Sequence, residues 1–349
     1  MSAAAAPHAA LAAGRFVKLI CGAGNQDLAA IEDLCAVYSL AGVHCIDVAA
    51  DVAVAAAARR GMEWAVERGA TRPWLMLSLS DGADPHFRKA SFDPTLCPCD
   101  CPRPCQRVCP ALAIGESGGV LAERCYGCGR CLPACPLGLI DEQPVLLSPE
   151  LVPELLGAVQ PDAVELHTQA GRQKAFAQRL QQVQTSGVPL QRLAVSCGLE
   201  RGAKARDGES AHAAETPLSA RELACELWQR FALVRQCGLK PLWQLDGRPM
   251  SGDVGAGTAR SAVKLLEAIR PWAPPGPLQL AGGTNASTAA LLSADAGAAG
   301  VAFGGRARSL LQPLLLQAEA RGGSLRKCPQ LLEQGLNLAQ ALLAPWQSR

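Results

Sequence analysis

The sequence predicts an α/β fold in which eight parallel strands, each followed by a helix, close into a TIM-like (β/α)8 barrel. The chain has 349 residues, a length that is normal for a large α/β barrel. Short apolar runs alternate with amphipathic or alanine-rich stretches, the pattern of β/α units with a parallel sheet. Eight such runs can be counted, which is the number that closes a barrel of this kind. An open, doubly wound sheet is the alternative fold.

One block interrupts the alternation after the third expected strand. Residues 84–142 are rich in cysteine and proline, and we expect them to form an insertion that leaves from the carboxyl end of that strand. This end is the functional side in both candidate folds. The alanine-rich residues 1–14 are expected to be a flexible tail, so that the barrel-like body comprises residues 15–83 and 143–349.

The expected elements follow from the periodicity in chain order. The strands are expected at Phe16–Cys21, Val43–Val48, Trp74–Leu79, Ala163–His167, Arg192–Cys197, Pro241–Leu245, Leu278–Ala281 and Gly300–Phe303. Helices are expected at about Asp27–Leu40, up to about Arg68, and at Arg172–Gln184, Ala220–Cys237, Thr258–Ile269 and Leu310–Ala320. The polar, glycine-rich segment 198–216 is expected to be a mobile loop.

The composition excludes several classes of function. The net charge is +2, from 33 Lys and Arg against 31 Asp and Glu, and aromatic residues make up 4% of the chain. Without a basic stripe or an aromatic platform, nucleic acid is not an expected partner. No apolar run approaches the roughly 18 residues of a membrane span, and the start lacks the basic region of a secretory signal. We therefore expect a cytoplasmic protein, whose 16 cysteines indicate metal binding rather than disulfides.

The downstream half of the insertion has the cysteine spacing of the bacterial ferredoxins. It reads Cys125-x2-Cys128-x2-Cys131-x3-Cys135-Pro136. Three thiolates two residues apart can wrap three irons of one cubane, while the fourth points to the other cluster. Gly127 and Gly129 allow the backbone to fold closely around it.

The upstream half repeats the pattern with wider spacing. It reads Cys97-x3-Cys101-x3-Cys105-x3-Cys109-Pro110. By the crossing rule of two-cluster ferredoxins, two [4Fe–4S] clusters are predicted. The ligands of cluster 1 are then Cys97, Cys101, Cys105 and Cys135, and those of cluster 2 are Cys125, Cys128, Cys131 and Cys109. Cys99 fits neither run and is interpreted as a non-ligand, and zinc is the alternative metal.

The insertion is locally neutral, with six Arg and Lys against six Asp and Glu in residues 85–142. A freely diffusing electron carrier usually has a charged docking face. The clusters are therefore expected to serve as an internal relay or a sensor.

Polar residues at the ends of the expected strands form a candidate pocket at one mouth of the barrel. These residues are Asp47, Asp81, His167, Asp246, Asn285 and Arg306. The alternative interpretation is that each of them caps a helix or forms a turn. Gly282, Gly283, Gly304 and Gly305 follow the last two strands, where barrels often bind phosphate, and are candidate anion-binding residues. No catalytic residue is assigned, because no Ser-His-Asp or Cys-His pairing is evident.

Several segments resemble the family of cyanobacterial light-dependent period proteins. They include Phe16-Val-Lys-Leu-Ile-Cys-Gly-Ala23, Ile31-Glu-Asp-Leu-Cys-Ala-Val-Tyr38, Gly42-Val-His-Cys-Ile-Asp-Val-Ala49, Asp84-Pro-His-Phe-Arg-Lys89 and Asp246-Gly-Arg-Pro-Met-Ser-Gly252, together with both cysteine runs. The resemblance covers nearly the whole chain after residue 15, except for the expected loop 198–216.

This resemblance implies an iron–sulfur redox sensor that relays light or electron-transport state to the circadian clock. It implies the clock proteins KaiA and KaiC and the histidine kinase CikA as partners, and we expect the quinone or ferredoxin pool to exchange electrons with the clusters. The alternatives are an iron–sulfur oxidoreductase with a substrate or flavin at the barrel mouth, and a structural or assembly scaffold.

Overall fold

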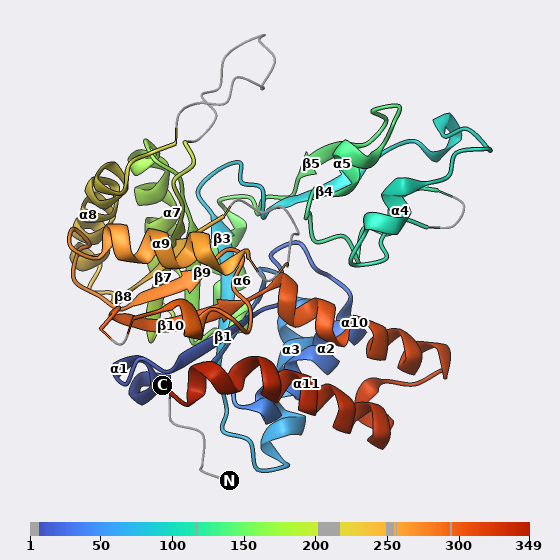
Figure 1. The fold of residues 1–349 in the computed structure, drawn as a ribbon. Coiled ribbons are helices and arrows are strands. Elements are labelled where there is room, and N and C mark those ends of the chain that lie inside the picture. The colour runs from blue at the N-terminus through green and yellow to red at the C-terminus, as the bar shows by residue number, and fades with distance from the viewer. Residues whose placement is uncertain (1–6, 116–117, 202–216, 249–254, 256, 294) are drawn as a thin grey trace.

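The computed structural model describes residues 7–115, 118–201, 217–248, 255, 257–293 and 295–349. Its strands form a closed parallel barrel in the order β1-β10-β9-β8-β7-β6-β3-β2 (Figure 1). The first and last barrel strands close the ring, with Phe16 in register with Gly300 and Leu19 with Phe303. The predicted barrel is therefore confirmed, and the open doubly wound sheet is excluded.

The barrel consists of eight strands with helices outside them. The strands are β1 (Phe16–Ile20), β2 (Cys45–Ala49), β3 (Trp74–Ser80), β6 (Ala163–His167), β7 (Arg192–Cys197), β8 (Pro241–Asp246), β9 (Leu278–Ala281) and β10 (Ala298–Phe303). The helices are α2 (Leu28–Ala41), α3 (Val52–Val66), α6 (Leu151–Val159), α7 (Gln173–Thr185), α8 (Ala220–Gln236), α9 (Ala259–Ile269), α10 (Gly305–Ala320) and α11 (Pro329–Gln347). Helices α6 and α11 lie outside the ranges expected from the sequence.

Local signals in the sequence explain where these helices begin and end. The Asp27 side chain accepts a hydrogen bond from the Ala30 amide and caps α2, which ends at Gly42 in the left-handed region. Ser219 and Glu222 form a capping box at the start of α8. All residues of β3 are buried, because helices cover the outside of the barrel and side chains fill its interior.

The closed end of the barrel is plugged by apolar side chains. Phe16, Trp74 and Met76 pack there with Ala10 and Leu11 of α1 (Pro7–Ala12). The prediction of a flexible tail at 1–14 is therefore wrong for residues 7–12. Alanine and leucine make this segment a good helix former, and its apolar side covers the end of the barrel. Residues 1–6 and 202–216, including most of the expected loop, lie outside the described residues.

The cysteine-rich segment leaves the barrel between β3 and α6 and projects away from it (Figure 1). Its base is an antiparallel ribbon of β4 (Arg88–Ser91) and β5 (Asp141–Pro144). It also carries the short helices α4 (Pro104–Val108) and α5 (Cys131–Ala134). The Lys89 ammonium donates to Gln26 at 2.6 Å, and Arg124 pairs with Glu319 of α10 at 2.5 Å. These contacts hold the segment against the barrel.

Candidate functional site

The structure brings together the four cysteines that the sequence assigns to cluster 2. Cys109, Cys125, Cys128 and Cys131 line one cavity, which encloses about 420 Å³ of empty space with open solvent included. Cys109 comes from the upstream run and the other three from the downstream run, so the crossing pattern is present in the geometry. Ala111, Ala113 and Ile114 supply part of the apolar wall of this cavity.

The chemistry of these thiols fits a cationic metal cluster. Burial and, to a smaller extent, the neighbouring thiols Cys128, Cys125 and Cys109 together raise the pKa of Cys131 to about 12. Burial likewise raises the pKa of Cys128. Four thiols that line one cavity lose their protons together only when a metal compensates the charge.

The backbone around the thiols is arranged for the same role. The Ala90 amide donates to Cys125 Sγ at 3.4 Å and the Ala113 amide to Cys109 Sγ at 3.2 Å. Amide donors of this kind stabilise cluster sulfur and tune its potential. Gly127 has a φ of +74°, and a Cβ there would lie 2.2 Å from the Arg88 carbonyl oxygen. Only glycine fits this close approach, which agrees with the role expected for Gly127 from the sequence.

The cysteines assigned to cluster 1 lie in two overlapping groups that share Cys105. Burial and the neighbouring thiols of Cys101 and Cys105 raise the pKa of Cys97, so these three cysteines lie close together. Cys105 and Cys135 belong to one apolar cluster with Ile114 and Ile140. The Leu139 amide donates to Cys135 Sγ at 3.4 Å. Cys99 is exposed.

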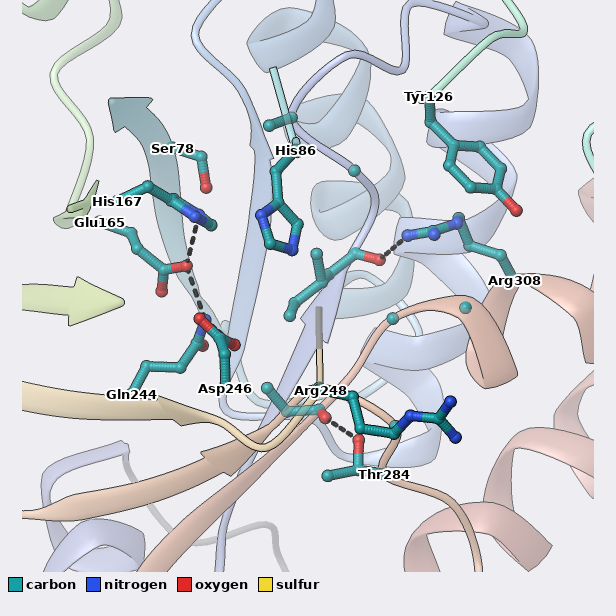
Figure 2. Close-up of a pocket in the computed structure, with 18 of the residues that line it drawn as sticks. Ser78, His86, Tyr126, Glu165, His167, Gln244, Asp246, Arg248, Thr284 and Arg308 are labelled. Atoms are coloured by element: carbon teal, nitrogen blue, oxygen red, sulfur yellow. Dashed lines mark hydrogen bonds and ion pairs between the residues drawn. The ribbon is translucent and has the colours of Figure 1, made fainter. Parts of the chain in front are cut away.

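A pocket opens at the carboxyl ends of the barrel strands (Figure 2). It encloses about 910 Å³ of empty space with open solvent included. The residues that the sequence predicted at this mouth and that line the pocket are His167, Asp246, Arg306, Gly282, Gly283, Gly304 and Gly305. Side chains that sequence reasoning missed also line it, namely Ser78, His86, Tyr126, Glu165, Gln244, Arg248, Thr284 and Arg308.

The other three predicted pocket residues stabilise the fold. Asp47 is buried under the pocket, where it accepts a hydrogen bond from Ser78 at 2.7 Å. Asp81 accepts hydrogen bonds from Thr168 and Arg172 at 2.5 and 3.4 Å. The Asn285 amide group donates to the Gly255 carbonyl at 3.0 Å. Asn285 also accepts a hydrogen bond from the Ser287 amide at 2.9 Å, which is a turn role. Asp47 and Asp81 instead make side-chain contacts that connect neighbouring parts of the barrel.

A buried charged layer forms the floor of the pocket. Lys18 is fully buried and is paired with Glu165 and, at 3.5 Å, with Asp47. Burial acts to lower the pKa of Lys18, but the two carboxylates outweigh it and raise that pKa above its ordinary value. The Gln244 amide donates to Glu165 at 2.9 Å and accepts from Gln279 at 2.8 Å. The layer is therefore hydrogen-bonded across the barrel.

One side of the pocket above this floor is acidic. His167 Nε2 lies 3.0 Å from Glu165 Oε1. Burial acts to lower the pKa of His167, but the hydrogen bond and charge of Glu165, with Asp84 and Asp246, raise it to about 9. Burial raises the pKa of Asp246, although His86 and His167 oppose this.

The opposite side of the pocket is cationic. Arg306 and Arg308 lie in the first turn of α10, whose N-terminal residues Gly304 and Gly305 line the pocket. A helix N-terminus with arginine beside it favours anions. The pocket therefore suits a ligand with an anionic group at one end and polar groups at the other.

Tyr126 connects this pocket with the cluster-2 cavity. Its side chain lines both. The Arg308 guanidinium carbon lies 4.0 Å from the centre of the Tyr126 ring, and Arg308 also donates to the Ile20 carbonyl of β1 at 2.8 Å. One ring therefore separates the thiols of Cys125 and Cys128 from the barrel mouth. Its position next to Cys125 was the available sequence signal.

No helix among the described residues is long and apolar enough to cross a membrane. Comparison with protein families finds two matches. Residues 155–345 match the light dependent period A C-terminal domain, and residues 97–146 match the LdpA Fe-S cluster-binding domain.

The chain is also similar to individual proteins. It is 47% identical over 350 residues to light dependent period A of Synechococcus elongatus, and the alignment covers 97% of this chain and 93% of that protein. Among solved structures it resembles (S)-3-O-geranylgeranylglyceryl phosphate synthase from Thermoplasma acidophilum, with 10% identity, a TM-score of 0.43, and 97% and 96% of the two chains covered. It also resembles Mycobacterium tuberculosis tryptophan synthase, with 10% identity, a TM-score of 0.44 and the same coverage.

Proposed function

The chain belongs to the light dependent period A family and carries its iron–sulfur cluster-binding domain, and from this premise we propose that it is a redox sensor with two [4Fe–4S] clusters. The observation that carries the proposal is the single cavity lined by Cys109, Cys125, Cys128 and Cys131. Cluster 2 is held by these four thiolates, and cluster 1 by Cys97, Cys101, Cys105 and Cys135. The clusters supply one-electron redox chemistry.

The barrel responds to the charge of cluster 2 through Tyr126 and Arg308. Reduction adds one negative charge in the cavity that Tyr126 lines, and the Arg308 guanidinium carbon lies 4.0 Å from the centre of the Tyr126 ring. Over a separation of about 10 Å and an effective permittivity of about 20, one unit charge contributes about 1.7 kcal/mol. That free energy shifts a conformational equilibrium, or the affinity of a partner that distinguishes two conformations, by roughly tenfold.

The name of the Synechococcus relative links it to light-dependent period control. The proposed role of this chain is therefore to report photosynthetic electron-transport state to the circadian clock in the cytoplasm. The quinone or ferredoxin pool exchanges electrons with the clusters. KaiA, KaiC and CikA are the proposed partners that read the result.

The test compares partner affinity in two redox states. The cluster-loaded protein is titrated anaerobically against KaiA, KaiC and CikA, first oxidised and then after dithionite reduction. We expect the affinity for at least one partner to change about tenfold, because one unit charge contributes about 1.7 kcal/mol. The Cys131→Ser variant is expected to lose the response, and Cys225→Ser, a change at an exposed cysteine, to keep it. Equal affinities in both states would contradict the proposal, and binding that survives loss of the clusters would favour a scaffold.

The barrel-mouth pocket favours a second candidate function, an iron–sulfur oxidoreductase. Arg306, Arg308 and the start of α10 offer a phosphate-binding side. The cluster-2 cavity lies one aromatic ring away, so an electron can pass between a cluster and a bound substrate or flavin. A flavin spectrum in the anaerobically purified protein would favour this function, and cluster absorbance alone would favour the sensor.

A further inference from the structure

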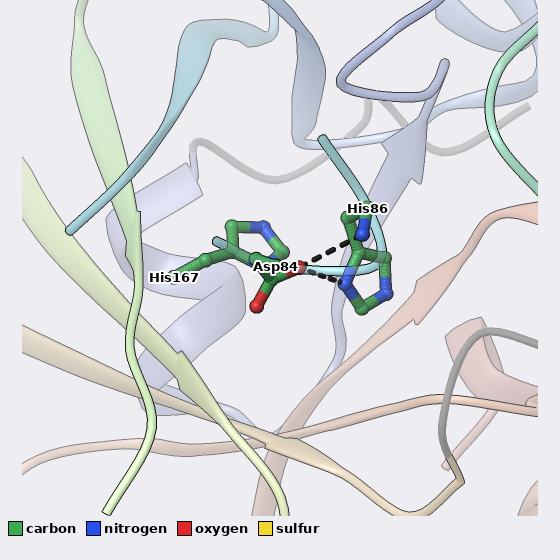
Figure 3. A group of neighbouring side chains, drawn as sticks. All are labelled: Asp84, His86 and His167. Carbon is green, nitrogen blue, oxygen red and sulfur yellow. Dashed lines mark hydrogen bonds and ion pairs between the residues drawn. The ribbon is translucent and has the colours of Figure 1, made fainter. Parts of the chain in front are cut away.

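We propose that Asp84, His86 and His167 hold one divalent metal ion at the barrel mouth, separate from the cluster iron (Figure 3). One ligand atom from each residue lies within 4.8 Å of the others. Asp84 Oδ1 is 2.8 Å from His86 Nδ1 and 4.0 Å from His167 Nδ1. Small side-chain rotations bring three such atoms to the roughly 2.0–2.2 Å that Zn²⁺ requires of nitrogen and carboxylate ligands.

The ligands come from two segments far apart in the sequence. His167 is the last residue of β6, whereas Asp84 and His86 lie between β3 and β4. The Asp84 carboxylate also accepts a hydrogen bond from the His86 amide at 2.8 Å, which fixes the loop. A metal ion at this point would connect the first residues of the cluster-binding insertion to strand β6 of the barrel.

The second ring nitrogen of His167 is already oriented as metal sites require. His167 Nε2 lies 3.0 Å from Glu165 Oε1, so Nδ1 faces Asp84, and a metal ion that binds there displaces the Nδ1 proton. A carboxylate behind a ligating histidine fixes its tautomer and raises its basicity. The Phe87 ring packs edge-on against His167 with centroids 5.1 Å apart and holds the imidazole plane.

The surrounding charge also favours a cation. The side chains of Asp84 and Glu165 are 7% and 0% exposed, and Asp246 lies nearby on the same side of the pocket (Figure 2). Beneath these carboxylates, in the floor of the pocket, Lys18 supplies a positive charge that is paired with Glu165. Buried carboxylates are generally paired or bound to a metal, and a divalent ion would compensate this excess.

The donor set indicates which ions would bind. Two imidazoles and one carboxylate suit Fe²⁺, Zn²⁺ or Mn²⁺, and three protein ligands leave coordination positions open. His86 and His167 line the pocket, so the open positions face it. The ion would hold an oxygen of the pocket ligand as a Lewis acid, opposite the arginines that hold its anionic end. This site does not depend on the proposed sensor function.

Mn²⁺ is the probe that tests the site, because it prefers nitrogen and oxygen to thiolate. The whole, cluster-loaded protein is oxidised to keep its clusters diamagnetic, and the signal of free Mn²⁺ is followed by EPR. We expect loss of signal equivalent to one ion per chain. His86→Gln and Asp84→Asn are each expected to weaken binding at least tenfold with unchanged cluster iron.

The matched control is His8→Gln, because His8 is exposed on α1 at the closed end of the barrel. It should bind Mn²⁺ like the wild type. The proposal is overturned if the wild type removes no Mn²⁺ signal, or if His86→Gln and Asp84→Asn bind as tightly as His8→Gln. Either result would make the three side chains a hydrogen-bonded chain of charges without a metal.

Discussion

Replacing Arg308 with methionine removes a positive charge from beside cluster 2 while keeping much of the side-chain volume. The guanidinium carbon lies 4.0 Å from the Tyr126 ring centre, and Tyr126 lines the cluster-2 cavity. Arg308 therefore stabilises the extra electron of the reduced cluster. The variant should have a lower reduction potential.

The size of the change depends on the separation between the Arg308 charge and the cluster, which we take as about two and a half times the 4.0 Å from Arg308 to the Tyr126 ring centre. A separation of about 10 Å gives about 1.7 kcal/mol at an effective permittivity of about 20. Since a tenfold change in a one-electron equilibrium is about 59 mV, this corresponds to about 70 mV. Solvent that doubles the permittivity would halve the shift, so we expect the potential to fall by roughly 35–70 mV.

The assay is an anaerobic redox titration followed by EPR, which resolves the two clusters. Arg308→Lys retains the charge and should lie close to the wild type. Arg321→Met is the remote control, because Arg321 is exposed just after α10. Equal potentials of cluster 2 in Arg308→Met and Arg321→Met, or a shift of cluster 1 alone, would refute the coupling through Tyr126.

Three further predictions concern the stability of the fold and the binding of cluster iron. Glu165→Gln leaves the buried Lys18 with one carboxylate at 3.5 Å and should lower the free energy of unfolding by about 3–5 kcal/mol; urea denaturation measures this, and full retention of stability would contradict it. Burial lowers the pKa of His44 to about 4 from 6.5. The neutral His44 imidazole therefore contributes fully to the free energy of unfolding above pH 6.5, and this contribution is lost as the pH falls toward 4. The loss is on the order of 3 kcal/mol, and a flat pH dependence of wild-type unfolding relative to His44→Gln would contradict it. Gly127→Ala places a Cβ 2.2 Å from a carbonyl oxygen, whereas Gly69 has a φ of +90° with nothing within 4 Å of its Cβ position. Gly127→Ala and the control Gly69→Ala each cost about 1–2 kcal/mol of backbone strain, but only Gly127→Ala should lose cluster iron. Equal iron contents of the two variants would refute the close-approach argument.

The barrel could be predicted because its strands are buried on both faces. Such strands are near-continuous apolar runs, and strand β6 at Ala163–His167 and strand β9 at Leu278–Ala281 match their expected ranges. Helix α1 in the N-terminal segment was harder to predict, because a short alanine-rich helix is stable only when it can pack against another part of the protein. The end of the barrel provides that partner for Ala10 and Leu11.

The pocket was only partly predictable. His167 and Asp246 were found because they end strands at the mouth. Glu165 and Lys18 were missed, because alternation within a strand does not tell which face points into a closed barrel. His86 reaches His167 only through the fold, since their proximity depends on how the loop after β3 returns over the barrel mouth.

The most direct test of two clusters is iron and sulfide analysis of the anaerobically purified chain, with EPR after reduction. We expect about eight irons and eight sulfides per chain, with coupled cubane signals. Cys125→Ser should remove the signal of cluster 2 and Cys101→Ser that of cluster 1, each leaving about four irons. Zinc in place of iron, or four irons or fewer in the reconstituted wild type, would contradict the assignment of the two cysteine runs.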